Sequence, residues 1–265
     1  GTDYADQILT AEGGDTVFAG DGDAIITNGG NDTVHLSDAG PSAAFLPLLD
    51  GGNGSNDTLT IRGDFSAAPT GFETVVFVAP SLLPGEAAHN QLNLGYGDPI
   101  TSDITTINFS DPGSATEDVL SFGVNPGFGQ ALTIDLSAIT VQNTSAFADN
   151  TGTLRVDRIE VFGAGENDSI TGAADARLYA FGLDGDDILT GGDYHAAFFG
   201  DRLDGQGGSD TLRGNGGSDF INGEDHSSQS AGLDTDVAVY DGNFAGSRYV
   251  VRTDAVYVDL NPYQL

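Results

Sequence analysis

A nine-residue step in the last third of the chain constrains the fold more than any other feature. Three aspartates follow one another at this interval: Asp201, Asp210 and Asp219. An aliphatic residue stands two positions after each of them, and glycine-rich turns precede the second and the third. Each unit is therefore a six-residue turn closed by Asp, followed by a three-residue strand with one inward apolar side chain. Because so short a strand buries little surface, the units must stack on one another to be stable.

Stacking brings the carboxylates of these units close together. Successive units take opposite edges of a flattened coil, so neighbours on the same edge are two units, or 18 residues, apart, and Asp201 lies over Asp219. Bare carboxylates stacked in this way repel each other. A divalent cation ligated by the carboxylates and by turn carbonyls removes that repulsion, and flexible coordination by oxygen alone is typical of calcium.

The units resemble the G-G-x-G-x-D-x-U-x nonapeptide of RTX, or hemolysin-type, calcium-binding proteins. Gln206 and Asn215 replace the second glycine, whereas the Asp, the fourth-position glycine and the aliphatic residue are kept. The resemblance implies a parallel β-roll that holds several Ca²⁺ ions between its turns. It covers residues 1–36 and 159–240, and not residues 60–158.

Two other stretches carry the same theme. In residues 1–36 one step is eight rather than nine, so the ligand position falls either on Asp23 with Ile25 inward or on Ala24 with Ile26 inward; the first choice keeps a carboxylate. In residues 159–190 the ligand position between Asp168 and Asp187 falls near Arg177, which cannot bind a cation. The expected calcium ligands are Asp6, Asp15, Asp23, Asp32, Asp168, Asp187, Asp201, Asp210, Asp219 and Asp236. Asp57 is either one more ligand or a cap of the strand that follows it.

The pattern predicts an all-β chain with four segments. Residues 1–36 form an N-terminal roll, residues 159–236 form a second roll with insertions, and residues 237–265 form a β cap. Residues 37–158 show strand-like alternation without a helical period, and this middle region is read as a β-sandwich or a widened β-solenoid.

Composition excludes several classes of function. A formal charge of -32 disfavours nucleic acids and anionic membranes as partners, and no apolar run approaches the length of a membrane span. Only seven of the 40 acids are Glu, and the short, turn-favouring Asp suits tight ion-binding turns. The chain contains no cysteine, no nucleophile-elbow or zinc-protease motif and no clustered histidines, so we expect no enzymatic activity and no catalytic residue. The missing initiator Met and signal peptide indicate a mature product or an excerpt of a longer protein.

The resemblance also implies a function. RTX modules leave the bacterial cell unfolded by type I secretion and fold outside it, where calcium is abundant. We therefore expect an extracellular structural protein of the cell surface or matrix, such as an S-layer, filament or adhesin segment. Its partners would be calcium, further copies of itself, other surface components or glycans. The alternatives are the C-terminal folding module of a secreted hydrolase and a carbohydrate-binding module.

Overall fold

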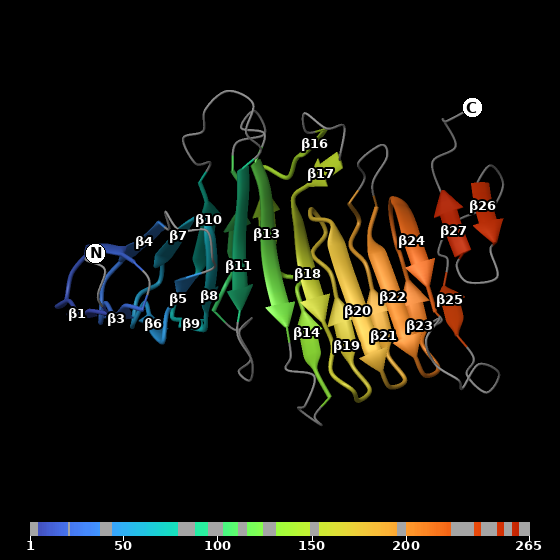
Figure 1. Ribbon diagram of the computed structural model, residues 1–265, viewed down its shortest axis with the longest axis horizontal. Helices are drawn as coiled ribbons and strands as arrows, with labels where there is room; N and C mark the ends of the chain where they lie inside the picture. The colour runs from blue at the N-terminus through green and yellow to red at the C-terminus, as the bar shows by residue number, and fades with distance from the viewer. Residues whose placement is uncertain are drawn as a thin grey trace. The chain divides into compact units, whose positions relative to one another are not determined.

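The computed structural model is all-β, as the sequence predicts. It describes residues 5–20, 22–37, 44–78, 88–94, 103–110, 116–123, 131–148, 154–194, 200–223, 236–239, 248–251 and 256–259. Every regular element among these residues is a strand, and nearly all strand pairs are parallel (Figure 1). No helix with the length and apolarity of a membrane span is found in this part of the chain.

The strands group into two compact units. The first contains residues 1–122 and 139–158, and the second contains residues 123–138 and 159–265. The boundary between them therefore differs from the segment boundaries that the sequence suggests, since residues 123–138 leave the middle region and join the second unit.

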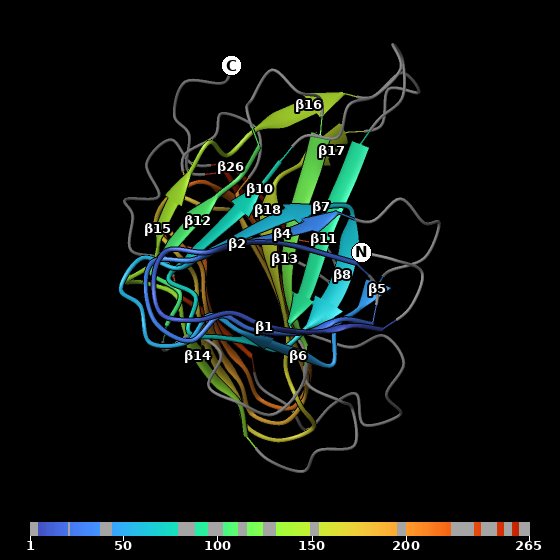
Figure 2. The same ribbon diagram turned by 90° about the vertical axis from the view of Figure 1, so that its left-hand side faces the viewer.

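Strands of three sheets build the first unit, and they lie on different sides of its coil (Figure 2). The first, six-stranded sheet contains β2 (Thr16–Ala19), β4 (Thr33–Ser37), β7 (Thr58–Arg62), β10 (Thr74–Phe77), β12 (Thr106–Asn108) and β15 (Thr140–Gln142). The second contains β1 (Gln7–Leu9), β3 (Ala24–Ile26), β6 (Leu48–Asp50) and β9 (Pro69–Thr70). The third contains β5 (Ala44–Phe45), β8 (Asp64–Ala67), β11 (Ala88–Leu94) and β13 (Thr116–Gly123). An antiparallel hairpin is formed by β16 (Ala146–Ala148) and β17 (Leu154–Val156).

The middle region is the solenoid of the two alternatives, and the sandwich reading is wrong for the described residues. In the six-stranded sheet the register runs without a break from Val34 to Leu59, Val75 and Ile107. All four side chains are fully buried. One row of aliphatic side chains thus continues from the N-terminal roll into the middle region, because each coil presents a single inward residue at the same place.

The second unit has two sheets on opposite faces of its coil. One contains β18 (Arg158–Phe162), β20 (Leu178–Asp184), β22 (Arg202–Gly207) and β24 (Ser218–Asn222). The other contains β14 (Thr133–Asp135), β19 (Ser169–Thr171), β21 (Ile188–Thr190), β23 (Thr211–Arg213) and β25 (Val237–Val239). The edge of β24 pairs antiparallel with β27 (Val256–Asp259), which also pairs with β26 (Arg248–Val251). Leu203, Leu212 and Ile221, the aliphatic residues of the nine-residue step, are at most 3% exposed.

The turns repeat one backbone conformation even where glycine is replaced. Gln206 and Asn215 stand four residues before an Asp and have φ angles of 69° and 58°. Leu183 holds the same position before Asp187 with a φ of 77°. This left-handed conformation is tolerated by Asn and costly for a bulky residue such as leucine. The stacking of the coils, rather than the conformational preference of each residue, therefore sets the backbone geometry of these turns.

Candidate metal-binding columns of aspartate

The predicted aspartates of the second unit stack into two columns. We call the first the long column: Asp168, Asp187, Asp210 and Asp236. Along it the backbone N–H of each Asp donates to Oδ1 of the next, at N···O distances of 2.7, 2.9 and 3.0 Å. Each carboxylate is thereby fixed one coil away from the next. Asp236 lies over Asp210, 26 residues away, because the coil between them is lengthened.

The second column of this unit contains Asp201 and Asp219, 18 residues apart. The N–H of Asp201 donates to Oδ1 of Asp219 at 2.8 Å, and the N–H of Leu178 donates to Oδ1 of Asp201 at 2.7 Å. The residue in register with Asp201 is therefore Leu178 and not Arg177, so the predicted empty ligand position is displaced by one residue.

The first unit contains a further column and a pair. The N–H of Asp15 donates to Asp32 and that of Asp32 to Asp57, both at 2.7 Å. The N–H of Asp57 donates in turn to Oε2 of Glu73, a residue that the aspartate spacing does not reveal. Asp57 therefore belongs to the column.

Asp6 and Asp23 form the pair of the first unit, joined by the Asp6 N–H and Oδ1 of Asp23 at 2.9 Å. Asp23 and Ile25 are both fully buried, which decides the eight-residue step in favour of Asp23. The carboxylate therefore keeps its place in the stack, and the shorter step is absorbed in the turn.

The second carboxylate oxygen is the unusual feature of these columns. Oδ2 of four aspartates is buried and has no hydrogen-bond partner within the described part of the chain: Asp15, Asp32, Asp57 and Asp187. An unsatisfied buried acceptor costs about 1–3 kcal/mol, and more when it is charged. At the equivalent places of Asp23, Asp168 and Asp201, Oδ2 accepts a backbone N–H from Gly20, Ala164 and Gly192 respectively. The four atoms without such a donor are the places where a cation could be ligated.

Glycines in the turns of the second unit lie close to Oδ2 atoms of its column aspartates. Gly163, Gly182, Gly205 and Gly214 each stand five residues before a column aspartate. A Cβ built on Gly182 would lie 2.0 Å from Oδ2 of Asp187 and 2.7 Å from the carbonyl oxygen of Gly205 in the next coil. The other three would meet an Oδ2 atom at 2.1 to 2.3 Å. Only glycine therefore fits at these four positions. At Gly182 the space that a side chain would fill lies between the Oδ2 atom of Asp187 and the carbonyl oxygen of Gly205.

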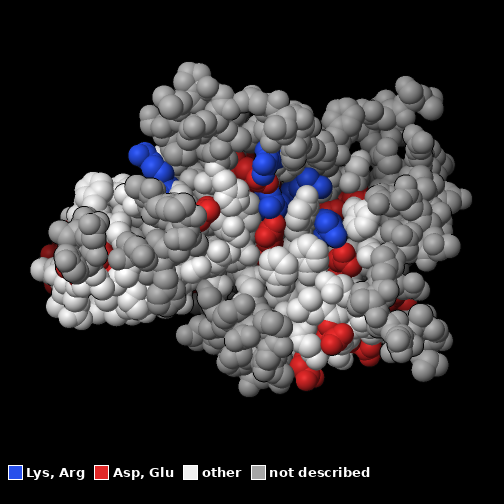
Figure 3. Space-filling model, viewed as in Figure 1, with Lys and Arg blue, Asp and Glu red and all other residues white. Residues whose placement is uncertain are grey.

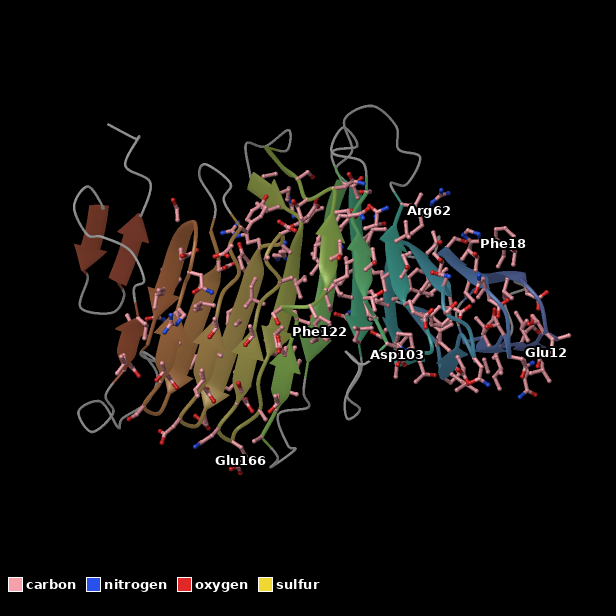
Figure 4. The ribbon with its side chains drawn as sticks, turned by 180° about the vertical axis from the view of Figure 1, so that it is seen from behind. Glu12, Phe18, Arg62, Asp103, Phe122 and Glu166 are labelled. Atoms are coloured by element: carbon pink, nitrogen blue, oxygen red, sulfur yellow. The ribbon has the colours of Figure 1, made fainter. Side chains whose placement is uncertain are left out.

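Burial and mutual repulsion change the acidity of the columns. Burial, reinforced by the charges of Asp210 and Asp168, raises the pKa of Asp187 to about 7. Burial likewise raises the pKa of Asp219 to about 7 and that of Asp201 well above its usual range. The pKa of Asp168 is also raised, first by burial and then by Glu166, which projects from the preceding turn (Figure 4). Keeping these carboxylates ionised in the folded chain therefore costs free energy.

A divalent cation with oxygen ligands suits this donor set. Oδ2 of Asp15, Asp32, Asp57 and Asp187 has no hydrogen-bond partner in the described residues, and the carbonyl oxygen of Gly205 lies near Oδ2 of Asp187, as calcium coordination requires. No three His, Cys, Asp or Glu side chains converge on one point within the described ranges. Each ion would therefore bind mainly between two coils, with backbone carbonyls completing its shell.

A third kind of column, in the middle region, was not predicted from the sequence. The amide of Asn90 donates to Oδ1 of Asp118 at 2.7 Å, and the N–H of Asp118 donates to Oδ1 of Asp157 at 3.0 Å. Here the second oxygen is satisfied, because Ser110 donates both its N–H and its hydroxyl to Asp118. Ser145 does the same for Asp157, at 2.7 Å from each atom. We call this the middle column.

Comparison of the chain with protein-family models, with curated proteins and with solved structures finds no match.

Proposed function

We propose that this chain is a secreted structural protein of the bacterial cell surface or matrix that folds on calcium, in the manner of RTX β-rolls. The observation that carries the proposal is the set of buried Oδ2 atoms without partners in Asp15, Asp32, Asp57 and Asp187. The resemblance of the repeats to the RTX nonapeptide supports the choice of calcium and the extracellular location.

Calcium would act here by neutralising charge. A chain with a formal charge of -32 cannot stack its carboxylates cheaply, and the raised pKa of Asp187 reports that cost. An ion shared by two coils would replace repulsion by common coordination, and each ordered coil would offer a template for the next. Extracellular calcium modules bind at about 10⁻⁴–10⁻³ M, so such a chain would stay unfolded inside the cell and fold outside it.

A titration of the metal-stripped chain tests this proposal. We expect the far-UV circular dichroism signal of β structure to rise cooperatively with calcium and not with magnesium. Isothermal titration calorimetry should then count fewer ions in the Asp210→Ala, Asp219→Ala double variant than in the wild type, together with a lower melting temperature. An unchanged ion count in that variant would refute the assignment of the columns as calcium sites.

Assembly is the second part of the proposal and needs its own measurement. Light scattering of the calcium-loaded protein should show species larger than a monomer if the ion also joins subunits. A monomer at every calcium concentration would restrict calcium to folding and would leave the matrix role without support.

A further inference from the structure

One face of the second unit carries aromatic rings and arginine on its solvent side. The outward positions of β18, β20, β22 and β24 are aligned in two rows across the sheet. The first row is Glu160, Tyr179, Arg202 and Phe220, and the second is Phe162, Phe181, Asp204 and Asn222. We call these eight residues the aromatic face. All four rings are partly exposed.

The side chains of this face hold one another in place. The rings of Phe162 and Phe181 stack with centroids 4.9 Å apart and planes 8° from parallel. The guanidinium of Arg202 lies 5.2 Å from the ring centre of Phe181 and 5.4 Å from that of Phe220. It also pairs with Asp204 at 3.1 Å, and Asp204 accepts a hydrogen bond from Asn222 at 2.9 Å. The result is a preorganised surface of rings and planar polar groups.

The fold itself does not require these rings. The apolar core of this unit is made by inward residues of the same strands, such as Val161, Ala180 and Leu203, which are fully buried. The opposite sheet, β14, β19, β21, β23 and β25, stacks equally regularly, and its outward positions carry no aromatic residue. Both sheets of this unit stack their strands in the same regular way, and only one of them carries aromatic rings on its outward side.

The balance of charge on this face indicates an uncharged ligand. Arg177, whose guanidinium lies 4.7 Å from the ring centre of Tyr179, and Arg202 offset Glu160 and Asp204. Figure 3 shows blue arginine atoms beside red acidic atoms on the face that Figure 1 views. In so acidic a chain, a locally neutral surface repels an anionic ligand less than other surfaces do, but it does not attract one.

We propose that the aromatic face binds an uncharged polysaccharide, laid across the strands. A pyranose ring has one apolar face of C–H groups, which packs on aromatic rings, and a rim of hydroxyls, which Arg202 and Asn222 can bind. Neighbouring strands are about 4.8 Å apart, close to the length of one sugar unit, so successive sugars can meet successive strands. This proposal goes beyond calcium-dependent folding, because it assigns a ligand to a face that contains none of the calcium columns.

Calorimetry with cellohexaose and laminarihexaose tests the proposal on the full chain in excess calcium. At least one of the two should bind, and Phe181→Ala should weaken that binding about tenfold or more. Asp204→Asn keeps the shape of this buried side chain but removes the ion pair that positions Arg202, so it should also weaken binding, and the test does not depend on one variant that could misfold. Phe18→Ala is the matched control: Phe18 is 66% exposed on β2 and lies in the other unit, so its loss should change nothing.

Each other result would overturn the proposal. These results are no binding of either sugar, equal binding by wild type and Phe181→Ala, and preferential binding of polygalacturonate. A dimer in light scattering that Arg202→Lys abolishes, without sugar binding, would make the face a protein interface instead. Circular dichroism in calcium separates these results from a failure of the calcium proposal, because a folded protein that binds no sugar refutes only the glycan site.

Discussion

The long column and the middle column use the same backbone arrangement and differ in one atom. In both, a backbone N–H donates to Oδ1 of the carboxylate in the next coil. In the middle column the second oxygen is closed by Ser110 or Ser145. In the long column Oδ2 of Asp187 is buried without a partner and faces a glycine turn.

On the calcium proposal, this difference would let a single chain combine metal-dependent and metal-independent coils. A serine supplies two donors from within the protein, so Asp118 and Asp157 are satisfied when the chain folds. The glycine turn beside Asp187 supplies no such donor, so on the calcium proposal its Oδ2 would be left to an external cation. Under that proposal, the group that approaches the second oxygen, rather than the carboxylate itself, would decide whether a coil needs the ion.

Removing calcium should give the largest difference in stability between the long column and the middle column. Each ion bound at 100 times its dissociation constant stabilises the fold by about 2.7 kcal/mol, and the long column would hold several. Hydrogen exchange read by mass spectrometry should therefore show peptides from residues 182–190 and 205–212 losing protection in chelator. Peptides from residues 116–122 and 154–157 should keep most of theirs. Equal loss in both regions would show that the serines do not replace the cation.

A methyl group placed against the carboxylate should have the next largest effect. Gly182→Ala would put a Cβ 2.0 Å from Oδ2 of Asp187, and overpacking of this kind costs about 1–3 kcal/mol. Gly165→Ala is the control, since a Cβ there would meet nothing within 4 Å. Thermal melts and calcium titrations should show Gly182→Ala with a lower melting temperature and weaker binding. Similar melts for the two variants would contradict the close approach.

Replacing a column carboxylate by its amide should give effects of opposite sign with and without calcium. Asp187→Asn removes a buried charge, so in chelator at pH 8 it should leave the melting temperature unchanged or raise it. In calcium it should lower the free energy of unfolding by about 1–2 kcal/mol, because a ligand is lost. Asp118→Asn should have the same effect in both conditions. A calcium-independent effect of Asp187→Asn would remove that residue from the metal sites.

The sequence predicts the stacking of Asp201 over Asp219 because the nine-residue step is visible there, whereas the long column steps by 19, 23 and 26 residues. The coil length can be read from the spacing of Asp201, Asp210 and Asp219, and that length predicts which aliphatic residues point inward. The middle column escapes the same reasoning, because 28 residues separate Asn90 from Asp118 and 39 separate Asp118 from Asp157. Coils of unequal length hide the period although their strands remain in register.

The structure also corrects the sequence where insertions shift the count. Leu178 rather than Arg177 lies in register with Asp201, and Asp236 lies over Asp210 across a lengthened coil. Spacing locates a ligand only when the coil between two positions has the standard length. The serine donors could have been found only by asking which residue satisfies the second oxygen, and this question needs the fold.

The raised pKa in the middle column should produce the smallest effect of these tests, a change of the unfolding free energy with pH. Burial raises the pKa of Asp157 to about 6, and the neighbouring charge of Asp118 adds to this shift. A carboxyl whose pKa is higher in the folded state destabilises the fold as pH rises, between its unfolded value and about 6. Acidification from pH 8 to pH 5 should therefore raise the unfolding free energy by about 1 kcal/mol through this residue alone. Denaturant melts should show this slope as the difference between wild type and Asp157→Asn, with all other groups in common. A difference that does not change with pH would mean that the two Ser145 donors keep Asp157 charged, and that the middle column is closed even more completely than its burial indicates.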